Sequence, residues 1–384
     1  MEKKRRLLLK ATGIKLGTPV YIYDSKIIKE KCRELKKNLP GVNLYYACKA
    51  NTNPEIIKLI YNEGFGIETV SPGEIKIAHK AGIPISKITF TCGSIDEKEL
   101  VSVVKQGIRV HLDSLHQVEI FGQNFPGKEI SVRLNLNIGA GYHSHVITEG
   151  PDSKFGIDIS QIKQLKRLAE KYKLRITGLH QHIGSNILSV PIFLRAIDAL
   201  FKTALLFPDL KHLDFGGGFG IPYKPKERRL DIKILGIKIK KTILNFIQKY
   251  GRKIKFSFEP GRYLVAEAGY LLVKVTDIKK NPTKTFVGVD SGLNHLIRPA
   301  MYGSYHEILN TSNAGSKKEK VTIAGNICES GDVFAKNRMI AKPKIGDILA
   351  IKNVGAYGYV MSSEYNSRPK PEEFMIIQNK IIKI

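Results

Sequence analysis

The chain has 384 residues, of which 62 are Lys or Arg and 35 are Asp or Glu, so its formal net charge is +27. Hydrophobic residues make up 42% and charged residues 25%, which excludes a largely disordered chain, and the length predicts two domains or one large one. No apolar run approaches the roughly 18 residues that cross a bilayer. The apolar stretch Leu7–Leu9 is shorter than the roughly 7–15 residues of an export signal. We therefore expect a cytoplasmic protein with no membrane contact.

The basic charge does not by itself indicate nucleic-acid binding. Lysines are spread along the whole chain, often between isoleucines, as in IKILGIKIKKTIL. There is no arginine-rich arm, zinc knuckle or aromatic RNA platform, so we expect no nucleic-acid partner. The cysteines Cys32, Cys48, Cys92 and Cys328 are scattered and form no CxxC, which predicts free thiols in a reducing compartment.

Before about residue 265, short apolar runs alternate with amphipathic helical patterns. The eight runs are Val42–Cys48, Gly66–Val70, Ile88–Cys92, Val110–Asp113, Ile130–Leu136, Ile176–His182, His212–Phe215 and Ile254–Phe258. Most are nearly continuous apolar segments, which is typical of parallel strands covered on both faces. Asn53-Pro54-Glu55 and the capping box that starts at Ser71 mark helix starts between them. This alternation predicts a (β/α)8 TIM-type barrel over residues 25–265, with an open doubly wound sheet as the alternative.

From about Ala266 the pattern changes. Strand-like runs are separated by Gly, Pro, Asn and Asp turns, and they cover Gly269–Val275, Thr285–Val289, Lys320–Ala324 and Asp347–Ile351. Helical periodicity is weak here, so we predict a C-terminal antiparallel β domain over residues 266–384. We expect the N-terminal segment 1–24 to pack with it. The fold class is therefore α/β plus β.

Residues of the types found in catalytic and anion-binding sites lie at the ends of the predicted barrel strands. These are Lys49 after the first strand, His180 and His182 at the end of the sixth, Gly216-Gly217-Gly218 after the seventh and Glu259 after the eighth. In a barrel, these ends meet at the mouth that carries the chemistry. We expect no metal site, because no carboxylate or cysteine supports the two histidines at ligand spacing.

A cofactor explains this set of residues better than any single motif does. A glycine turn exposes backbone N–H groups to a phosphate, a lysine can form an imine with an aldehyde, and a buried carboxylate can hold a protonated ring nitrogen. Phosphate, aldehyde and ring nitrogen together indicate pyridoxal 5'-phosphate. In the second domain, Arg298 and Tyr302 suit a substrate carboxylate, because a guanidinium binds carboxylates bidentately.

Seven motifs then carry a family resemblance over nearly the whole chain, from about Thr18 to about Glu373. In order, they are YACKAN, HQHIGS, GGGFG, EPGRYLVAEAG, RPAMYGSYHEI, CESGDVF and GAYGYVMSSEYNSRPKPEE. The chain resembles the fold-type III, pyridoxal-phosphate-dependent decarboxylases, which include ornithine and arginine decarboxylases. Within them, IGAGYHSHVITEGPDSKFGI is similar to the diaminopimelate decarboxylase branch. This resemblance implies decarboxylation of meso-2,6-diaminopimelate at its D-centre to L-lysine and CO2, the last step of lysine biosynthesis.

The resemblance also implies roles around the cofactor. Lys49 would hold its aldehyde covalently, His182 would stack on the ring, and Glu259 would pair with the ring nitrogen. Ser185, Gly216, Gly217 and Gly218 would hold the phosphate, and Arg262 would sit at the mouth shared by phosphate and substrate. Glu68 in FGIETVS stands where the family usually has an aspartate beside the lysine and ring.

For the substrate, the resemblance implies that Arg298, Tyr302 and Arg262 bind a carboxylate. Cys328 would reprotonate the carbon and Glu329 would bind the distal amine, both from the partner subunit of a homodimer with shared active sites. Tyr357 would close over phosphate and substrate.

Four other interpretations remain. A sister decarboxylase would act on ornithine, arginine, lysine or carboxynorspermidine, but Arg298 favours a distal carboxylate. A non-catalytic regulatory homologue would lack Lys49 or Cys328, and both are present. A racemase would need a second base on the opposite face, for which we find no motif. A nucleic-acid-binding protein would show salt-sensitive retention on DNA and no cofactor colour.

Overall fold

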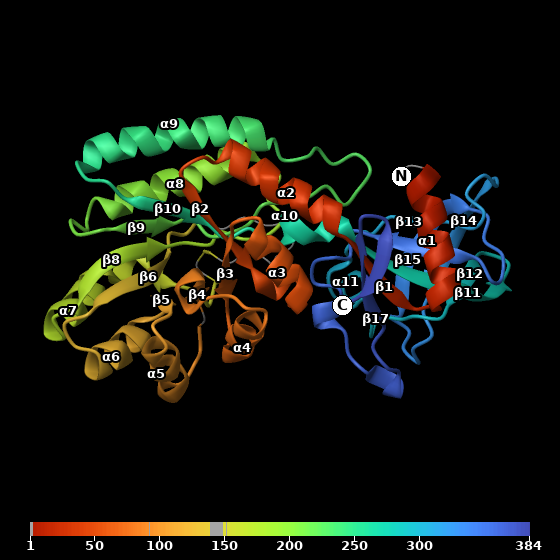
Figure 1. Cartoon of the computed structure of the whole chain (residues 1–384), viewed down its shortest axis with the longest axis horizontal. Helices are drawn as coiled ribbons and strands as arrows, with labels where there is room; N and C mark the ends of the chain where they lie inside the picture. Colours follow the sequence, from red (N-terminus) through yellow and green to blue (C-terminus); the bar gives the residue numbers. More distant parts are fainter. Residues whose placement is uncertain (1–2, 92, 139–148, 151) are drawn as a thin grey trace. The chain divides into compact units, whose positions relative to one another are not determined.

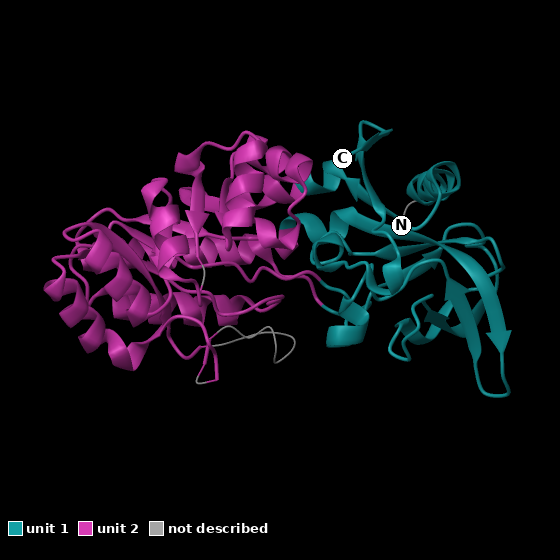
Figure 2. Ribbon diagram, turned by 90° about the horizontal axis from the view of Figure 1, so that it is seen from below, with its two compact units in different colours: residues 1–28, 222–227, 264–384 teal, residues 29–221, 228–263 magenta. Residues whose placement is uncertain are grey.

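The computed structural model describes residues 3–91, 93–138, 149–150 and 152–384. Cys92 and most of the segment IGAGYHSHVITEGPDSKFGI lie outside this part of the chain. The chain divides into two compact units (Figure 2). The barrel unit comprises Lys29–Ile221 and Arg228–Tyr263, and the β unit comprises Met1–Ile28, Pro222–Glu227 and Leu264–Ile384.

Eight parallel strands form the closed sheet of the barrel unit (Figure 1). They are β2 (Val42–Ala47), β3 (Gly66–Thr69), β4 (Ile88–Phe90), β5 (Arg109–Leu112), β6 (Glu129–Asn135), β8 (Arg175–His180), β9 (His212–Asp214) and β10 (Lys255–Phe258). The short strand β7 (Ile157–Asp158) pairs with β6 alone. Strand β10 pairs with β2, and β5 pairs with β6, so the ring of strands closes. The predicted (β/α)8 barrel is confirmed. The open doubly wound alternative is wrong, because an open sheet would leave two edge strands unpaired on one side, and the eight strands of this sheet are all paired on both sides.

Helix α2 precedes the first barrel strand and the other helices follow barrel strands, and α3 and α4 begin at the signals predicted for them. They are α2 (Ser25–Asn38), α3 (Pro54–Asn62), α4 (Pro72–Lys80), α5 (Glu97–Lys105), α6 (Leu115–Asn124), α7 (Ile162–Lys171), α8 (Val190–Ala204) and α9 (Ile232–Tyr250). The side chain of Asn53 accepts the Glu55 N–H at 3.0 Å, and Ser71 Oγ accepts the Glu74 N–H at 3.2 Å. These side chains satisfy amide groups that a helix start would otherwise leave unpaired.

The β unit is a mixed sheet in which most neighbouring strands are antiparallel. Its strands are β1 (Val20–Asp24), β11 (Gly269–Lys280), β12 (Thr285–Val289), β13 (Ile308–Asn310), β14 (Lys318–Ala324), β15 (Val333–Ala341), β16 (Ile348–Lys352), β17 (Glu372–Ile377) and β18 (Lys380–Lys383). Two pairs, β1–β17 and β12–β14, are parallel. The predicted antiparallel character is confirmed for the rest. The first of these pairs forms because β1 inserts between β11 and β17, which lie far away in sequence.

Three helices complete the description: α1 (Lys3–Leu16), α10 (Arg262–Val265) and α11 (Arg298–Tyr302). Leu9 of α1 is buried in one hydrophobic cluster with Val20, Leu272 and Ile376 of the sheet. Burial of these side chains holds α1 on the β unit.

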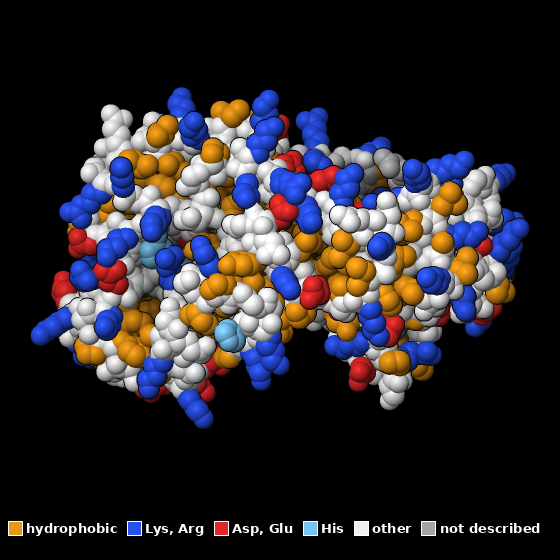
Figure 3. Space-filling view, in the orientation of Figure 1, with side chains coloured by type: hydrophobic (Ala, Val, Ile, Leu, Met, Phe, Trp, Pro, Cys, Tyr) orange, Lys and Arg blue, Asp and Glu red, His pale blue; other side chains and the backbone are white. Residues whose placement is uncertain are grey.

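Basic side chains are spread over the surface instead of forming one patch. Figure 3 shows Lys and Arg side chains over both units on the face in view, with apolar and acidic groups between them. Within the described ranges, no helix is both long enough and apolar enough to cross a membrane.

A substitution in the helical layer of the barrel tests its packing. Phe201 of α8 stacks on Phe246 of α9 with ring centroids 4.1 Å apart, and both are buried. Phe201→Ala should lower the free energy of unfolding by about 3–5 kcal/mol, because it leaves a cavity. Urea unfolding followed by circular dichroism measures this change. The neighbouring exposed Lys202→Ala is the control, with an expected change within about 0.5 kcal/mol. Equal midpoints for the two variants would contradict this packing.

Candidate active site at the carboxyl ends of the barrel strands

Lys49 and Glu68 face each other at neighbouring strand ends. Lys49 lies in the 3-10 turn Cys48–Ala50 that directly follows β2, and Glu68 lies in β3. Lys49 Nζ is 3.7 Å from Glu68 Oε2. The lysine side chain is 38% exposed and the glutamate 1%, so the amine reaches the mouth of the barrel above a buried carboxylate.

Glu259 is the second buried carboxylate of this mouth. It directly follows β10, and its Oε2 lies within hydrogen-bond distance of His180 Nε2, at 3.0 Å. Among the described residues, Glu259 Oε1 and Glu68 Oε2 have no hydrogen-bond partner. A buried carboxylate oxygen without a donor is costly, so the site is suited to an added positive group such as a protonated ring nitrogen.

Burial also changes the acidity of both carboxyl groups. Loss of water raises the pKa of Glu68 and of Glu259 above the usual glutamate value, and the positive charge of Lys49 acts in the opposite direction on both. Arg133 of β6, which pairs with Asp113 at 3.3 Å, likewise opposes this increase. The protonation of this site therefore depends on which cations it holds.

His182 and the three glycines lock together the ends of β8 and β9. The Gly217 N–H donates to His182 Nδ1 at 3.0 Å, so this nitrogen is an acceptor and the ring proton lies on Nε2. Burial lowers the pKa of His182 well below its ordinary value, which keeps the ring neutral. A Cβ on Gly217 would lie 2.4 Å from the Glu259 carbonyl oxygen, and Gly216 and Gly218 have φ of +67° and +102°. This bend requires glycine at each of these positions.

These bonds narrow the role predicted for the glycine turn. The Gly216 N–H donates to Asp214 Oδ1 at 2.8 Å, and that of Gly217 is held by His182. Neither amide is therefore directed at a phosphate. Arg262, which is 5% exposed, donates from Nη2 to Ser185 Oγ at 2.9 Å. Gly218, Ser185 and Arg262 remain the better candidates for the anion.

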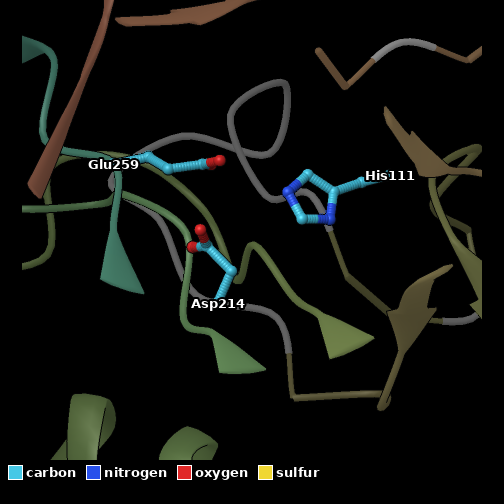
Figure 4. A group of neighbouring side chains, drawn as sticks. All are labelled: His111, Asp214 and Glu259. Carbon is cyan, nitrogen blue, oxygen red and sulfur yellow. The ribbon is translucent and has the colours of Figure 1, made fainter. Parts of the chain in front are cut away.

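Asp214 and His111 lie beside Glu259 in the barrel core, and their side chains converge with it (Figure 4). The nitrogen and oxygen atoms of the three side chains that could bind a cation lie within 4.8 Å of one another. However, Asp214 Oδ2 accepts the Ser257 hydroxyl at 2.5 Å, while Oδ1 accepts an amide and one Glu259 oxygen is bonded to His180. We interpret the group as part of a buried polar network around Glu259, and we assign no metal ion to it.

Arg298 and Tyr302 belong to the β unit, one turn apart on α11. Arg298 is 1% exposed, and its Nη1 lies 3.2 Å from Tyr223 Oη and 3.1 Å from His306 Nε2. Its guanidinium also lies over the Tyr223 ring, 4.9 Å from the centroid. These contacts fix the plane of the guanidinium, and Tyr302 is half-buried beside it in sequence.

Cys328 and Glu329 are exposed in the turn between β14 and β15. The Cys328 N–H donates to Asn366 Oδ1 at 2.8 Å, which ties this turn to the segment before β17. Tyr357 is half-buried, with a left-handed φ of +57°. Cys32, Cys48 and Cys328 are free thiols, as predicted.

The polar side chains around Glu259 were not predicted from the sequence. No role was predicted for His111 or Asp214, and His180 was singled out only for its position at a strand end. The available signal was a polar residue inside each short apolar run, RVHLD and HLDFG. Polar groups in buried strands are costly unless they are bonded, so such residues indicate a network in the core.

Most of a large cavity, about 1360 Å³ in volume, lies at the opposite end of the barrel strands. The first residues of several strands line it, among them Arg109, Glu129 and Lys255. Lys49, Glu68 and Glu259 do not border it. Volume alone therefore does not identify the site in this fold.

Comparisons with known proteins agree with this geometry. The family described as "Pyridoxal-dependent decarboxylase, pyridoxal binding domain" matches residues 25–266. The diaminopimelate decarboxylase of Methanothermobacter thermautotrophicus is 41% identical over 377 residues, which cover 95% of this chain and 88% of the relative. The crystal structure of the Methanocaldococcus jannaschii diaminopimelate decarboxylase with L-lysine superposes with a TM-score of 0.89 at 30% identity, covering 97% and 90% of the two chains.

A barrel with these strand-end residues, together with these matches, defines the class of protein. The chain belongs to the pyridoxal-dependent decarboxylases and, within them, to the diaminopimelate decarboxylase family. A lysine/ornithine decarboxylase from Vibrio vulnificus shares the fold, with a TM-score of 0.85 at 22% identity over 97% of each chain.

The buried carboxylate predicts a pH-dependent stability of the cofactor-free protein. Folding raises the pKa of Glu259. Its contribution to the free energy of unfolding is therefore largest below about pH 4.3, the pKa in the unfolded chain, and is lost as the pH rises through the pKa in the folded protein. Glu259→Gln cannot ionise, so this loss of stability at high pH disappears in the variant. The melting temperature of the variant relative to the parent protein should therefore be higher at pH 8 than at pH 5.

The matched control for this melting experiment is the exposed Glu170→Gln on α7, whose difference from the parent should be the same at both pH values. A pH-independent difference for Glu259→Gln would contradict the raised pKa.

Proposed function

We propose that this protein is a cytoplasmic, pyridoxal 5'-phosphate-dependent enzyme that decarboxylates meso-2,6-diaminopimelate at its D-centre to L-lysine and CO2, the last step of lysine biosynthesis. The observation that carries the proposal is the placement of Lys49, Glu68 and Glu259 together at the carboxyl ends of three strands of the barrel. The free thiols of Cys32, Cys48 and Cys328 support a reducing compartment.

The residues present at the mouth fit the cofactor. Lys49 would hold its aldehyde, Glu259 Oε1 would accept the ring N–H, and the neutral His182 ring would lie against the ring. The phosphate would be held by Gly218, Ser185 and Arg262. When bound, pyridoxal 5'-phosphate supplies an electron sink for the electron pair left when CO2 departs.

The protein groups then control protons and orientation. Glu259 would favour a protonated ring nitrogen, because the buried carboxylate is stabilised by a positive partner. Lys49 would be the amine that holds the cofactor, and it lies beside Glu68. Cys328 delivers a proton from its thiol to the carbon that has lost CO2. Which bond breaks is set by how the carboxylates of the substrate are held.

Arg298 is the residue on which the choice of substrate depends. Its guanidinium plane is fixed by Tyr223 and His306, and a fixed guanidinium favours the planar, bidentate geometry of a carboxylate. A substrate with a distal carboxylate, such as diaminopimelate, would use this group together with Tyr302 of the same helix. Ornithine, arginine and lysine have no distal carboxylate for this group to bind. We therefore rank a sister decarboxylase that acts on one of them as the second candidate, below a diaminopimelate decarboxylase.

We also propose that the enzyme is a homodimer with shared active sites. Cys328 and Glu329 are exposed on one turn of the β unit, where a thiol and a carboxylate are accessible to a second chain. In the dimer, Glu329 would bind the distal amine of the substrate in the site of the partner, and Cys328 would act there as the acid. Tyr357 would close over the phosphate and substrate.

The first experiment measures CO2 release on four substrates in parallel. The protein, loaded with pyridoxal 5'-phosphate, is given meso-diaminopimelate, L-lysine, L-ornithine or L-arginine, and the product is analysed on a chiral column. We expect release from diaminopimelate alone, with L-lysine as the product. Release from a mono-carboxylate amino acid would keep the cofactor role and contradict the role of Arg298.

A mixing experiment tests the shared site. Lys49→Ala and Cys328→Ala should each lose nearly all activity when purified separately. After the two variants are mixed and allowed to exchange subunits, about a quarter of the parent activity should return, since half of the dimers then hold one intact site. The control mixes Lys49→Ala with Lys49→Ala,Cys328→Ala, in which no site is intact. No recovery in the first mixture, with exchange verified by native mass spectrometry, would place Lys49 and Cys328 of one chain in the same site.

A further inference from the structure

A column of polar side chains lies beneath Glu259 in the barrel core, and no step proposed above uses it. His180 of β8 bonds to Glu259 Oε2 at 3.0 Å and stacks on His111 of β5, with ring centroids 4.7 Å apart. His111 Nδ1 lies 2.7 Å from Ser131 Oγ of β6, which in turn lies 3.2 Å from His212 Nε2 of β9. His180 and His111 are each 1% exposed.

The bond between His180 and Glu259 has a defined direction. An ionised carboxylate only accepts hydrogen bonds, so when Glu259 is ionised the proton lies on His180 Nε2, which donates across the 3.0 Å contact. Burial lowers the pKa of His180 well below its ordinary value, so the ring is neutral and its Nδ1 is bare. Within the described part of the chain, this Nδ1 has no hydrogen-bond partner. Donation to Glu259 is therefore the polar contact that orients the ring.

The surroundings of His180 hold the ring in that orientation. The His111 ring lies against it at an angle of 31°, and Ser131 fixes His111 in turn. Near the same carboxylate, Asp214 is held by the Ser257 hydroxyl and the Gly216 amide (Figure 4 shows the side chains of Asp214, His111 and Glu259 converging). Such a packed arrangement sets the direction of a side chain to within a narrow range.

We propose that His180 is a positioning residue that keeps Glu259 ionised and commits its Oε2, so that Oε1 faces the ring nitrogen of the cofactor. This inference rests on the proposed function, because it assigns the nitrogen to Glu259. A hydrogen bond donated to an ionised carboxylate stabilises the ionised form. Without His180, the buried Glu259 would keep its own proton, and it would no longer favour a proton on the ring nitrogen of the cofactor.

Other charged and titratable groups act on Glu259 from the surrounding strands. They are Lys49 after β2, Tyr45 of β2, Glu68 of β3, His111 of β5, Arg133 of β6, Asp214 of β9 and His182 after β8. Lys49 and Arg133 favour the ionised form, whereas Glu68 and Asp214 disfavour it. His180 Nε2 lies within hydrogen-bond distance of this carboxylate, at 3.0 Å, so its removal is the specific change.

The test compares His180→Phe, which keeps a stacking ring but no donor, with His180→Gln, whose amide N–H can replace Nε2–H. We measure the dissociation constant of pyridoxal 5'-phosphate by absorbance titration, and kcat and KM on diaminopimelate, between pH 6 and pH 9. For His180→Phe we expect a 10- to 100-fold lower kcat and weaker cofactor binding at pH 6.5, about the effect of one charge-assisted hydrogen bond. Both effects should shrink toward pH 9, where Glu259 ionises without help, and KM should change little.

His180→Gln should restore cofactor affinity and the pH profile to near those of the parent protein, and the exposed His116→Phe on α6 should change neither. A loss for His180→Phe that is equal at all pH values, or a His180→Gln variant as impaired as His180→Phe, would overturn the proposal. If His180→Phe does not fold, as judged by its melting curve, Ser131→Ala serves instead. Ser131→Ala removes the hydrogen bond that holds His111, so the decrease of kcat at acid pH should begin at a higher pH than in the parent protein. This shift should be smaller than the effect expected of His180→Phe. The same pH profile as the parent protein would overturn the proposal.

Failure of the proposed function would look different from failure of this inference. A parent protein that binds no pyridoxal 5'-phosphate, or that releases no CO2 from diaminopimelate, contradicts the function itself. A parent protein that binds the cofactor and is active, with His180 variants that show no pH-dependent loss, contradicts the positioning role alone.

Discussion

Glu259 imposes the strongest constraint on this molecule, because it is a carboxylate placed in the dry core of a closed barrel. Its desolvation disfavours the charged form, and the pKa of its carboxyl group rises accordingly. The neighbouring groups can be understood as responses to that cost. His180 Nε2 lies within hydrogen-bond distance of one oxygen, Lys49 and Arg133 contribute positive charge, and the other oxygen has no hydrogen-bond partner among the described residues.

The geometry that places Glu259 comes from the glycine turn and the strand ends around it. Gly217 has no room for a side chain beside the Glu259 carbonyl, and its amide fixes the tautomer of His182. One short turn thus sets the position of a carboxylate backbone and of the ring of a histidine. The amides of Gly216 and Gly217 donate to Asp214 and His182, so they are not directed at an anion. Gly218, Ser185 and Arg262 remain the candidates for binding one.

The β unit carries a different kind of chemistry. Arg298 is held in a fixed plane by aromatic and imidazole neighbours, whereas Cys328 and Glu329 are exposed on a turn. A buried, fixed group suits recognition of a carboxylate, and an exposed pair suits use by a second chain. The difference between these environments is consistent with the homodimer with shared sites that we propose.

Much of this was already determined by the order of residues along the chain. Alternating apolar runs and helix caps predicted the barrel, and ordered motifs such as YACKAN and EPGR predicted the family, because local patterns depend on neighbours in sequence. The role proposed for His180, the polar network that includes His111 and Asp214, and the hydrogen bonds of the glycine amides depend on the tertiary structure. These features depend on side chains from strands up to 148 residues apart, as between His111 and Glu259, and on which hydrogen bonds remain unmade after the barrel closes. The pairing of β1 with β17 arises in the same way, since strand partners distant in sequence are chosen by burial and register in the folded chain.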